Sequence, residues 1–92
     1  MKTLAHKLIS VASGVPSIAT GDIVICNVDL AMIHDSGGPR RVKPILERLN
    51  RSVWDKDKVV VVTDHYVPAT NAETQAIQAL TKEWVREQDI EK

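Results

Sequence analysis

Four consecutive valines, Val59–Val62, constrain the fold of this chain more than any other feature. β-Branched side chains favour an extended strand that neighbouring layers cover. Thr63, Asp64 and His65 follow the run directly, and Pro68 opposes an immediate helix. The sequence therefore predicts a strand that is buried on both faces and ends in an acid and a histidine.

Asp64 and His65 form a candidate acid–base pair at the point where this strand passes into a loop. A histidine titrates near neutral pH, and a neighbouring carboxylate can orient its ring and stabilise its charge. Successive residues of an extended chain point to opposite faces, so the two side chains can cooperate only if the backbone turns here. On spacing alone, a simple polar turn remains the alternative.

The other elements expected are three helices, because apolar residues recur at helical spacing in three segments. Capping residues, glycine or proline bound each segment, as is usual at helix ends. The expected helices run from a cap at Thr3 to about Ala12, from between Pro39 and Lys43 to about Asn50, and from a capping box at Thr70–Glu73 to about Gln88. Pro44 fits the second helix only within its first turn.

A second strand is expected at Ile23–Cys26, a short apolar run that follows a turn. In that strand Cys26 would be a small buried hydrophobe rather than a nucleophile. For Leu30–Ile33 we favour a loop or a short helical turn. Two strands joined through a helix predict a parallel βαβ unit, whose strands end at the same edge of the sheet.

Two loops should meet at this edge and form the candidate site. The first carries His34, Asp35 and Ser36, and the second carries Asp64 and His65. A flexible loop with helix-starting residues is the alternative for the first of them. No metal site is predicted, since these side chains lack a diagnostic ligand spacing.

The composition excludes several classes of protein. The chain has 92 residues with 43% hydrophobic content, which suits one domain with a modest core. Lys+Arg and Asp+Glu number 12 each, so no basic excess points to nucleic acid or to an acidic membrane surface. No apolar run approaches the ~18 residues of a membrane-spanning helix. Cys26 is the only cysteine, which fits a reducing compartment, and we expect a cytoplasmic protein.

Several stretches of the chain carry a resemblance that covers nearly its whole length. They are Thr3–Ile9, Gly21–Val24 with Asp29–Asp35, and above all Val59–Asn71, which contains Asp-His-Tyr-Val-Pro. Together they resemble the aconitase family, and within it the large subunits of 3-isopropylmalate dehydratase. The resemblance implies an α/β fold, layered α/β/α of aconitase type. Residues 1–92 would be the N-terminal βαβ portion of that domain, with three helices and no complete second domain.

The same resemblance implies a hydro-lyase, an enzyme that removes water from a hydroxy acid and adds it back. Such enzymes hold a 4Fe–4S cluster on three cysteines, and the open iron acts as a Lewis acid. By resemblance, His65 would protonate the departing hydroxyl with support from Asp64. His34 would contact the substrate, and its neighbours Asp35 and Ser36 are the further substrate-binding residues expected.

The family's cluster cysteines come later in the sequence, and none matches Cys26. We therefore expect the first part of a longer large subunit, inactive alone, whose partners are the rest of that subunit and a small subunit. A truncated product that serves as a non-catalytic α/β interaction module is the alternative. Ile33 and Ser36–Gly38 depart from the residues usual in isopropylmalate dehydratases. The substrate thus stays open among 3-isopropylmalate, dimethylmalate and homocitrate or homoaconitate.

Overall fold

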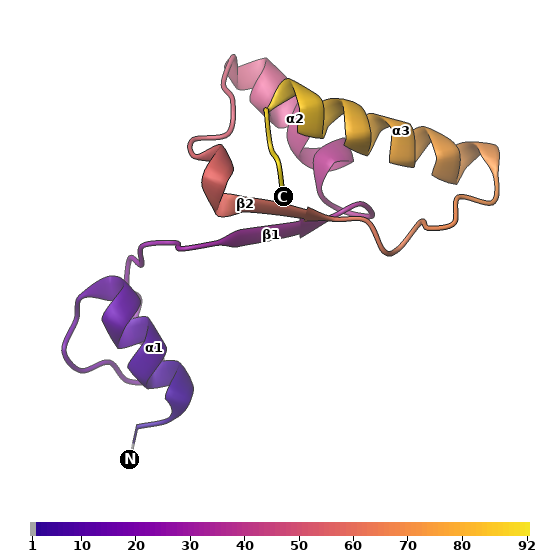
Figure 1. Ribbon diagram of the computed structural model, residues 1–92. Helices are drawn as coiled ribbons and strands as arrows, with labels where there is room; N and C mark the ends of the chain where they lie inside the picture. The colour runs from indigo at the N-terminus through magenta and orange to yellow at the C-terminus, as the bar shows by residue number, and fades with distance from the viewer. Residues whose placement is uncertain (1) are drawn as a thin grey trace.

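A two-stranded parallel sheet with two helices on one face forms the centre of the computed structural model, which describes residues 2–92 (Figure 1). The elements in chain order are α1 (Leu4–Ser13), β1 (Ala31–His34), α2 (Pro39–Leu49), the 3₁₀ helix η1 (Lys56–Lys58), β2 (Val59–Val62) and α3 (Ala72–Glu87). The strands pair in parallel, from Ala31 opposite Val59 to His34 opposite Val62. The fold is therefore α/β, and β1, α2 and β2 make the expected parallel βαβ unit.

The first strand lies at a different place from the one predicted. β1 occupies Ala31–His34, where a loop or short helical turn was expected, and Ile23–Cys26 is not a strand. Ile23 and Ile25 are 98% and 92% exposed, and Cys26 is also exposed rather than buried. A strand needs a neighbour for its backbone hydrogen bonds. β2 provides that neighbour for Ala31–His34, and Ile33 adds contact with the core.

Helix α1 confirms the first predicted helix but buries none of its side chains. The Thr3 side chain accepts a hydrogen bond from the His6 amide at its start, and Gly14 ends it with a left-handed φ of 72°. Its apolar face is open, since Leu4 and Leu8 are 71% and 60% exposed. The helix stands apart from the sheet (Figure 1).

Helices α2 and α3 lie near their predicted positions but differ in detail. Pro44 lies in the second turn of α2, so its expected place in the first turn is wrong. Proline has no N–H to donate, so α2 lacks one backbone hydrogen bond at Pro44. Val42 and Leu46, on either side of Pro44, pack against the core and offset this loss. Helix α3 begins one residue later than the predicted box, because the Asn71 side chain accepts the Thr74 amide at 2.9 Å.

The core lies between the sheet and helices α2 and α3, with Trp84 at its centre and only 1% exposed. Val59 and Ile90 are buried with it, and partly buried neighbours complete the cluster: Ile33, Val42, Leu46, Val53, Val61 and Val85. Alternate strand residues face this core, so Val59 is buried and Val60 only half-buried. Within residues 2–92, the valine strand is covered on one face and not on both.

No helix in the described part of the chain combines the length and the apolar character that a membrane crossing requires.

Candidate functional site

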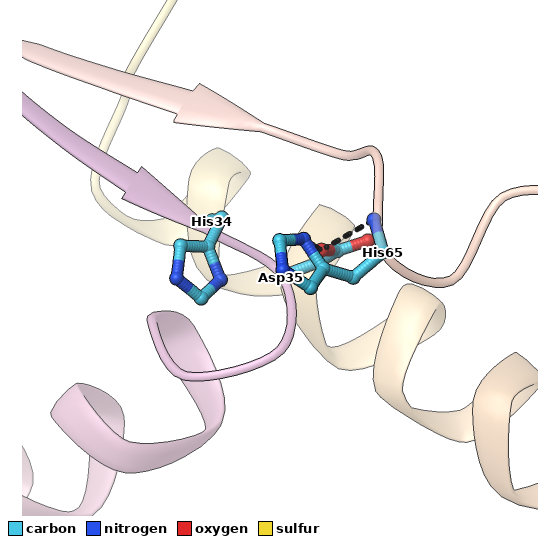
Figure 2. A group of neighbouring side chains, drawn as sticks. All are labelled: His34, Asp35 and His65. Carbon is cyan, nitrogen blue, oxygen red and sulfur yellow. Dashed lines mark hydrogen bonds and ion pairs between the residues drawn. The ribbon is translucent and has the colours of Figure 1, made fainter.

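The carboxyl ends of β1 and β2 bring His34 and His65 together, as Figure 2 shows. His34 is the last residue of β1, and His65 lies in the turn that follows β2. Their ring centroids are 4.4 Å apart, with 14° between the ring planes. Parallel pairing places both strand exits at one edge, so the predicted convergence of the two loops is confirmed.

Asp64 and His65 are in direct contact. His65 Nδ1 lies 2.6 Å from Asp64 Oδ1. The chain turns at His65 and Tyr66, which lets two successive side chains meet. The hydrogen bond with His65 holds the pKa of the Asp64 carboxyl below its usual value, so Asp64 stays ionised at neutral pH. Because Nδ1 is occupied, Nε2 of His65 is the nitrogen that can exchange a proton with a bound molecule.

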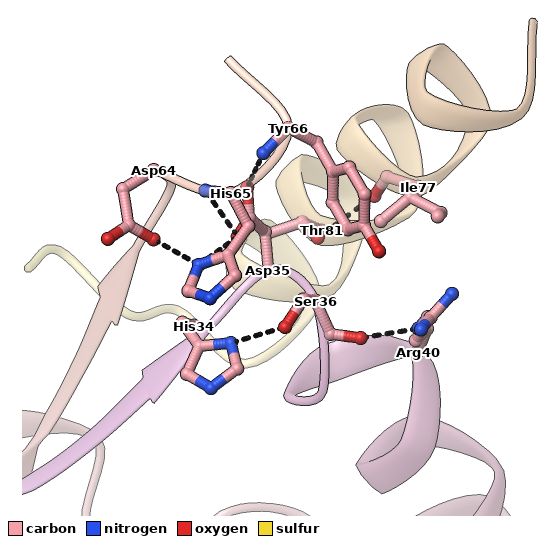
Figure 3. A network of polar contacts seen from close by, with 9 residues as sticks. All are labelled: His34, Asp35, Ser36, Arg40, Asp64, His65, Tyr66, Ile77 and Thr81. Atoms are coloured by element: carbon pink, nitrogen blue, oxygen red, sulfur yellow. Dashed lines mark hydrogen bonds and ion pairs between the residues drawn. The ribbon is translucent and has the colours of Figure 1, made fainter.

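Asp35 is fully buried and joins the two loops (Figure 3). The amide of His65 donates to Asp35 Oδ1 at 3.2 Å, and the amide of Tyr66 donates to Oδ2 at 3.2 Å. The Asp35 amide in turn donates to the carbonyl of Val62 at 3.1 Å. Both carboxylate oxygens are thus engaged inside the protein. Asp35, one of the expected substrate-binding residues, is 0% exposed, and its carboxylate contacts the turn after β2.

His34 is held by its own loop. Ser36 Oγ lies 2.9 Å from His34 Nδ1, and Arg40 Nε donates to the Ser36 carbonyl at 2.6 Å (Figure 3). The Gly38 amide donates to the His34 carbonyl at 2.8 Å. An open pocket of about 230 Å³ lies beside this loop and is lined by Met32, Ile33, His34, Gly37, Gly38 and Val42. His34 and Ser36 therefore combine hydrogen-bonding groups with space for a small molecule.

Sequence reasoning missed Arg40 as a partner of this loop, and it placed Gly38 in the loop without assigning it a contact with His34. Arg40 stands four residues after Ser36 at the start of α2, a spacing that could have drawn attention to it. Gly38 leaves room for the close approach of the His34 carbonyl, since a Cβ at this position would lie 2.5 Å from that oxygen.

The ligand atoms of His34, Asp35 and His65 lie within 4.8 Å of one another, which raises the question of a metal ion. A metal binds an imidazole along the lone pair, in the plane of the ring. The two rings are nearly parallel and 4.4 Å apart, so one ion cannot lie in both planes. The Asp35 oxygens already accept backbone amides. The arrangement suits proton transfer and hydrogen bonding better than a metal centre.

Nearly the whole chain matches a part of several longer known proteins. It is 46% identical to "3-isopropylmalate dehydratase large subunit 1" of Methanopyrus kandleri and 39% identical to the 3-isopropylmalate dehydratase large subunit of Herpetosiphon aurantiacus, over 90 residues each. It is 34% identical over 91 residues to a probable methanogen homoaconitase large subunit of Methanothermobacter thermautotrophicus. These matches cover 98%, 97% and 95% of the chain.

The chain spans about a fifth of the length of these relatives, since each match covers 21% of the relative. No protein-family model matches it.

Proposed function

The chain belongs to the family of 3-isopropylmalate dehydratase large subunits, and we propose that it supplies the general acid of a hydro-lyase acting on a hydroxy acid. The contact between Asp64 and His65 carries this proposal. It lies at a sheet edge where a second histidine, His34, stands beside an open pocket.

His65 is the proposed acid. In its protonated form, Nδ1–H is held by Asp64 and Nε2–H can be given to a departing hydroxyl, which then leaves as water. The ionised Asp64 carboxylate balances the positive charge of the imidazolium before the transfer. After the transfer, the neutral ring can take a proton back from water in the reverse, hydrating direction.

His34 and Ser36 are the proposed substrate contacts. Hydroxy acids present carboxylate and hydroxyl oxygens, which ring nitrogens and hydroxyl groups can bind. The contact between Ser36 Oγ and His34 Nδ1 fixes the ring, so His34 Nε2 is the nitrogen left for a substrate. Holding the substrate beside His65 would orient its leaving hydroxyl toward the acid.

A 4Fe–4S cluster, when bound, supplies Lewis-acid activation of the substrate in this family. The residues of this chain do not fit as its ligands. Cys26 is the only cysteine, it is exposed, and its Sγ lies beside α1, 3.9 Å from the Ile9 carbonyl. We propose that the ligands belong to a longer large subunit, which also completes the α/β/α layers over the open sheet face and binds a small subunit.

Among substrates, we propose 3-isopropylmalate, and with it a cytoplasmic role in leucine biosynthesis. Dimethylmalate and homocitrate or homoaconitate are the alternatives, since one relative is named a homoaconitase. Ile33, Gly37 and Gly38 line the pocket beside His34, and Ser36 Oγ lies 2.9 Å from His34 Nδ1. Exchange of Ile33 or of residues in Ser36–Gly38 should therefore change the preference.

The test uses the large subunit that contains this segment, assembled with its small subunit and loaded with cluster. His65→Ala should lower the turnover of 3-isopropylmalate by about 10²–10⁴-fold, the range for loss of a general acid. His6→Gln is the matched control, because His6 lies in α1 and contacts Thr3 and Thr20 rather than the candidate site. Near-wild-type turnover of His65→Ala at equal cluster content would contradict the proposal.

A non-catalytic interaction module is the second candidate, and the exposed Ile23 and Ile25 favour it. The 92-residue chain would then be stable and monomeric until its partner is added, which sedimentation can measure. Aggregation of the isolated chain, with a downstream coding sequence that contains the cysteines, would favour the enzyme.

A further inference from the structure

We infer that Asp35 is a positioning residue for His65, acting through the backbone of the turn rather than through the substrate. The inference rests on the proposed function, because it assigns Asp35 a task only if His65 is the acid. Its physical basis is the junction of the two loops seen in Figure 3.

The carboxylate of Asp35 fixes the direction of the chain as it leaves β2. Two successive amides, those of His65 and Tyr66, donate one to each of its oxygens at 3.2 Å. Successive amides converge on one carboxylate only when the backbone between them turns. That turn is the condition under which His65 can reach back to Asp64, and the two side chains are 2.6 Å apart.

Asp35 is itself anchored to the sheet. Its amide donates to the Val62 carbonyl at 3.1 Å, which extends the pairing of β1 with β2 by one residue. The side chain is 0% exposed, so the carboxylate lies against the turn and away from solvent. Asp64, by contrast, has a side chain 60% exposed and depends on the turn for its contact with His65.

Asp35 and Asp64 contact His65 in different ways, one through the backbone of the turn and the other through the imidazole ring. Asp35 Oδ1 is 3.6 Å from His65 Nδ1, beyond hydrogen-bond length, while Asp64 Oδ1 makes the short contact. The groups that face the His65 ring are Asp35, Asp64 and His34. Asp64 therefore holds the ring nitrogen, and Asp35 holds the backbone that carries the ring.

The first measurement needs no variant. In the assembled enzyme, hydrogen–deuterium exchange of peptides covering residues 63–67 should show protected amides. Asp35→Asn should reduce that protection, since an amide side chain offers one acceptor oxygen instead of two and can hold only one of the two amides. Turnover should fall by about 10–100-fold, the effect of misplacing a catalytic group by about an ångström, with KM unchanged within about twofold.

Asp55→Asn is the matched control. Asp55 also accepts a backbone amide, that of Asp57 at 3.1 Å, but at the opposite end of β2. This variant should retain wild-type turnover and leave residues 63–67 protected.

Four results would overturn the inference. They are rapid exchange of residues 63–67 in the wild type, unchanged exchange in Asp35→Asn, a raised KM with unchanged kcat, and wild-type kcat with only a lower melting temperature. If Asp35→Asn yields no folded enzyme, the wild-type exchange and the kcat of Asp35→Glu decide. A fully active His65→Ala would instead reject the proposed function, while the exchange data would still report whether Asp35 holds the turn.

Discussion

The imidazole of His34 lies parallel to that of His65, with their centroids 4.4 Å apart. Each ring is held at Nδ1 by a neighbour from its own loop, Ser36 for His34 and Asp64 for His65. The two rings thus share one site but have separate supports. This separation predicts different kinetic effects when each histidine is replaced.

His34→Gln should weaken substrate binding more than it slows the chemical step. The lost hydrogen bond is worth about 0.5–1.5 kcal/mol, which corresponds to a rise in KM of roughly 2–10-fold. Steady-state kinetics of the assembled enzyme measure the split between KM and kcat. A fall in kcat as large as that of His65→Ala, without a change in KM, would contradict a binding role.

The pKa of the Asp64 carboxyl should lie below the ordinary value of an aspartate, because its hydrogen bond with His65 favours the charged form. A pKa lowered in the folded state means that the stabilising contribution is present at neutral pH. It is lost as the pH falls through the folded-state pKa. Carboxyl ¹³C NMR of the large subunit that contains this segment, with ¹³C-labelled aspartate, should show the midpoint of the Asp64 titration moving upward in His65→Ala. His6→Gln should leave the Asp64 midpoint unchanged. An unchanged midpoint in His65→Ala would contradict the conclusion that the hydrogen bond with His65 lowers the pKa of Asp64.

Gly38→Ala should destabilise the chain and displace the His34 loop. The new Cβ would lie 2.5 Å from the His34 carbonyl oxygen and 3.2 Å from Ile33 Cβ, so backbone has to move. Overpacking of this kind costs about 1–3 kcal/mol of unfolding free energy. Urea unfolding measures it, with Gly37→Ala as the control, because there the nearest atom, His34 Cε1, is at an ordinary 3.5 Å. Equal stability of the two variants would contradict the close approach at Gly38.

Trp84→Ala should lower the free energy of unfolding by about 3–5 kcal/mol, which is a large part of the stability of a small domain. Trp84 is 1% exposed and packs against Val59 and Ile90. Trp54→Ala is the matched control, because Trp54 is 89% exposed and contacts the Lys58 ammonium at 5.4 Å. Its loss should cost less than about 1 kcal/mol. Denaturant unfolding followed by circular dichroism would reject this account of the core if both variants lost the same free energy.

Local patterns were sufficient for much of the fold. The valine run predicted β2 at its observed position, and apolar spacing with capping residues predicted all three helices. The order of elements predicted parallel pairing, which places the His34 and His65 loops at one edge. The same reasoning predicted that Asp64, His65, His34 and Ser36 gather there, because polar residues after parallel strands meet at that edge.

The choice of the first strand could not be made locally. Ile23–Cys26 and Ala31–His34 are both short and largely apolar, and the first has more β-branched residues. A strand is defined by its neighbour, and only the second segment pairs with β2 and places Ile33 against the core.

The sequence by itself determined which residues could carry the chemistry and at which edge of the sheet they would gather. The tertiary structure alone decided how they face one another. Asp64 and His65 are adjacent in sequence, yet their contact depends on a turn held by Asp35, which directly follows the other strand. The physical reason is that a backbone turn is fixed by the hydrogen bonds of its amides, and here their acceptor lies far away along the chain.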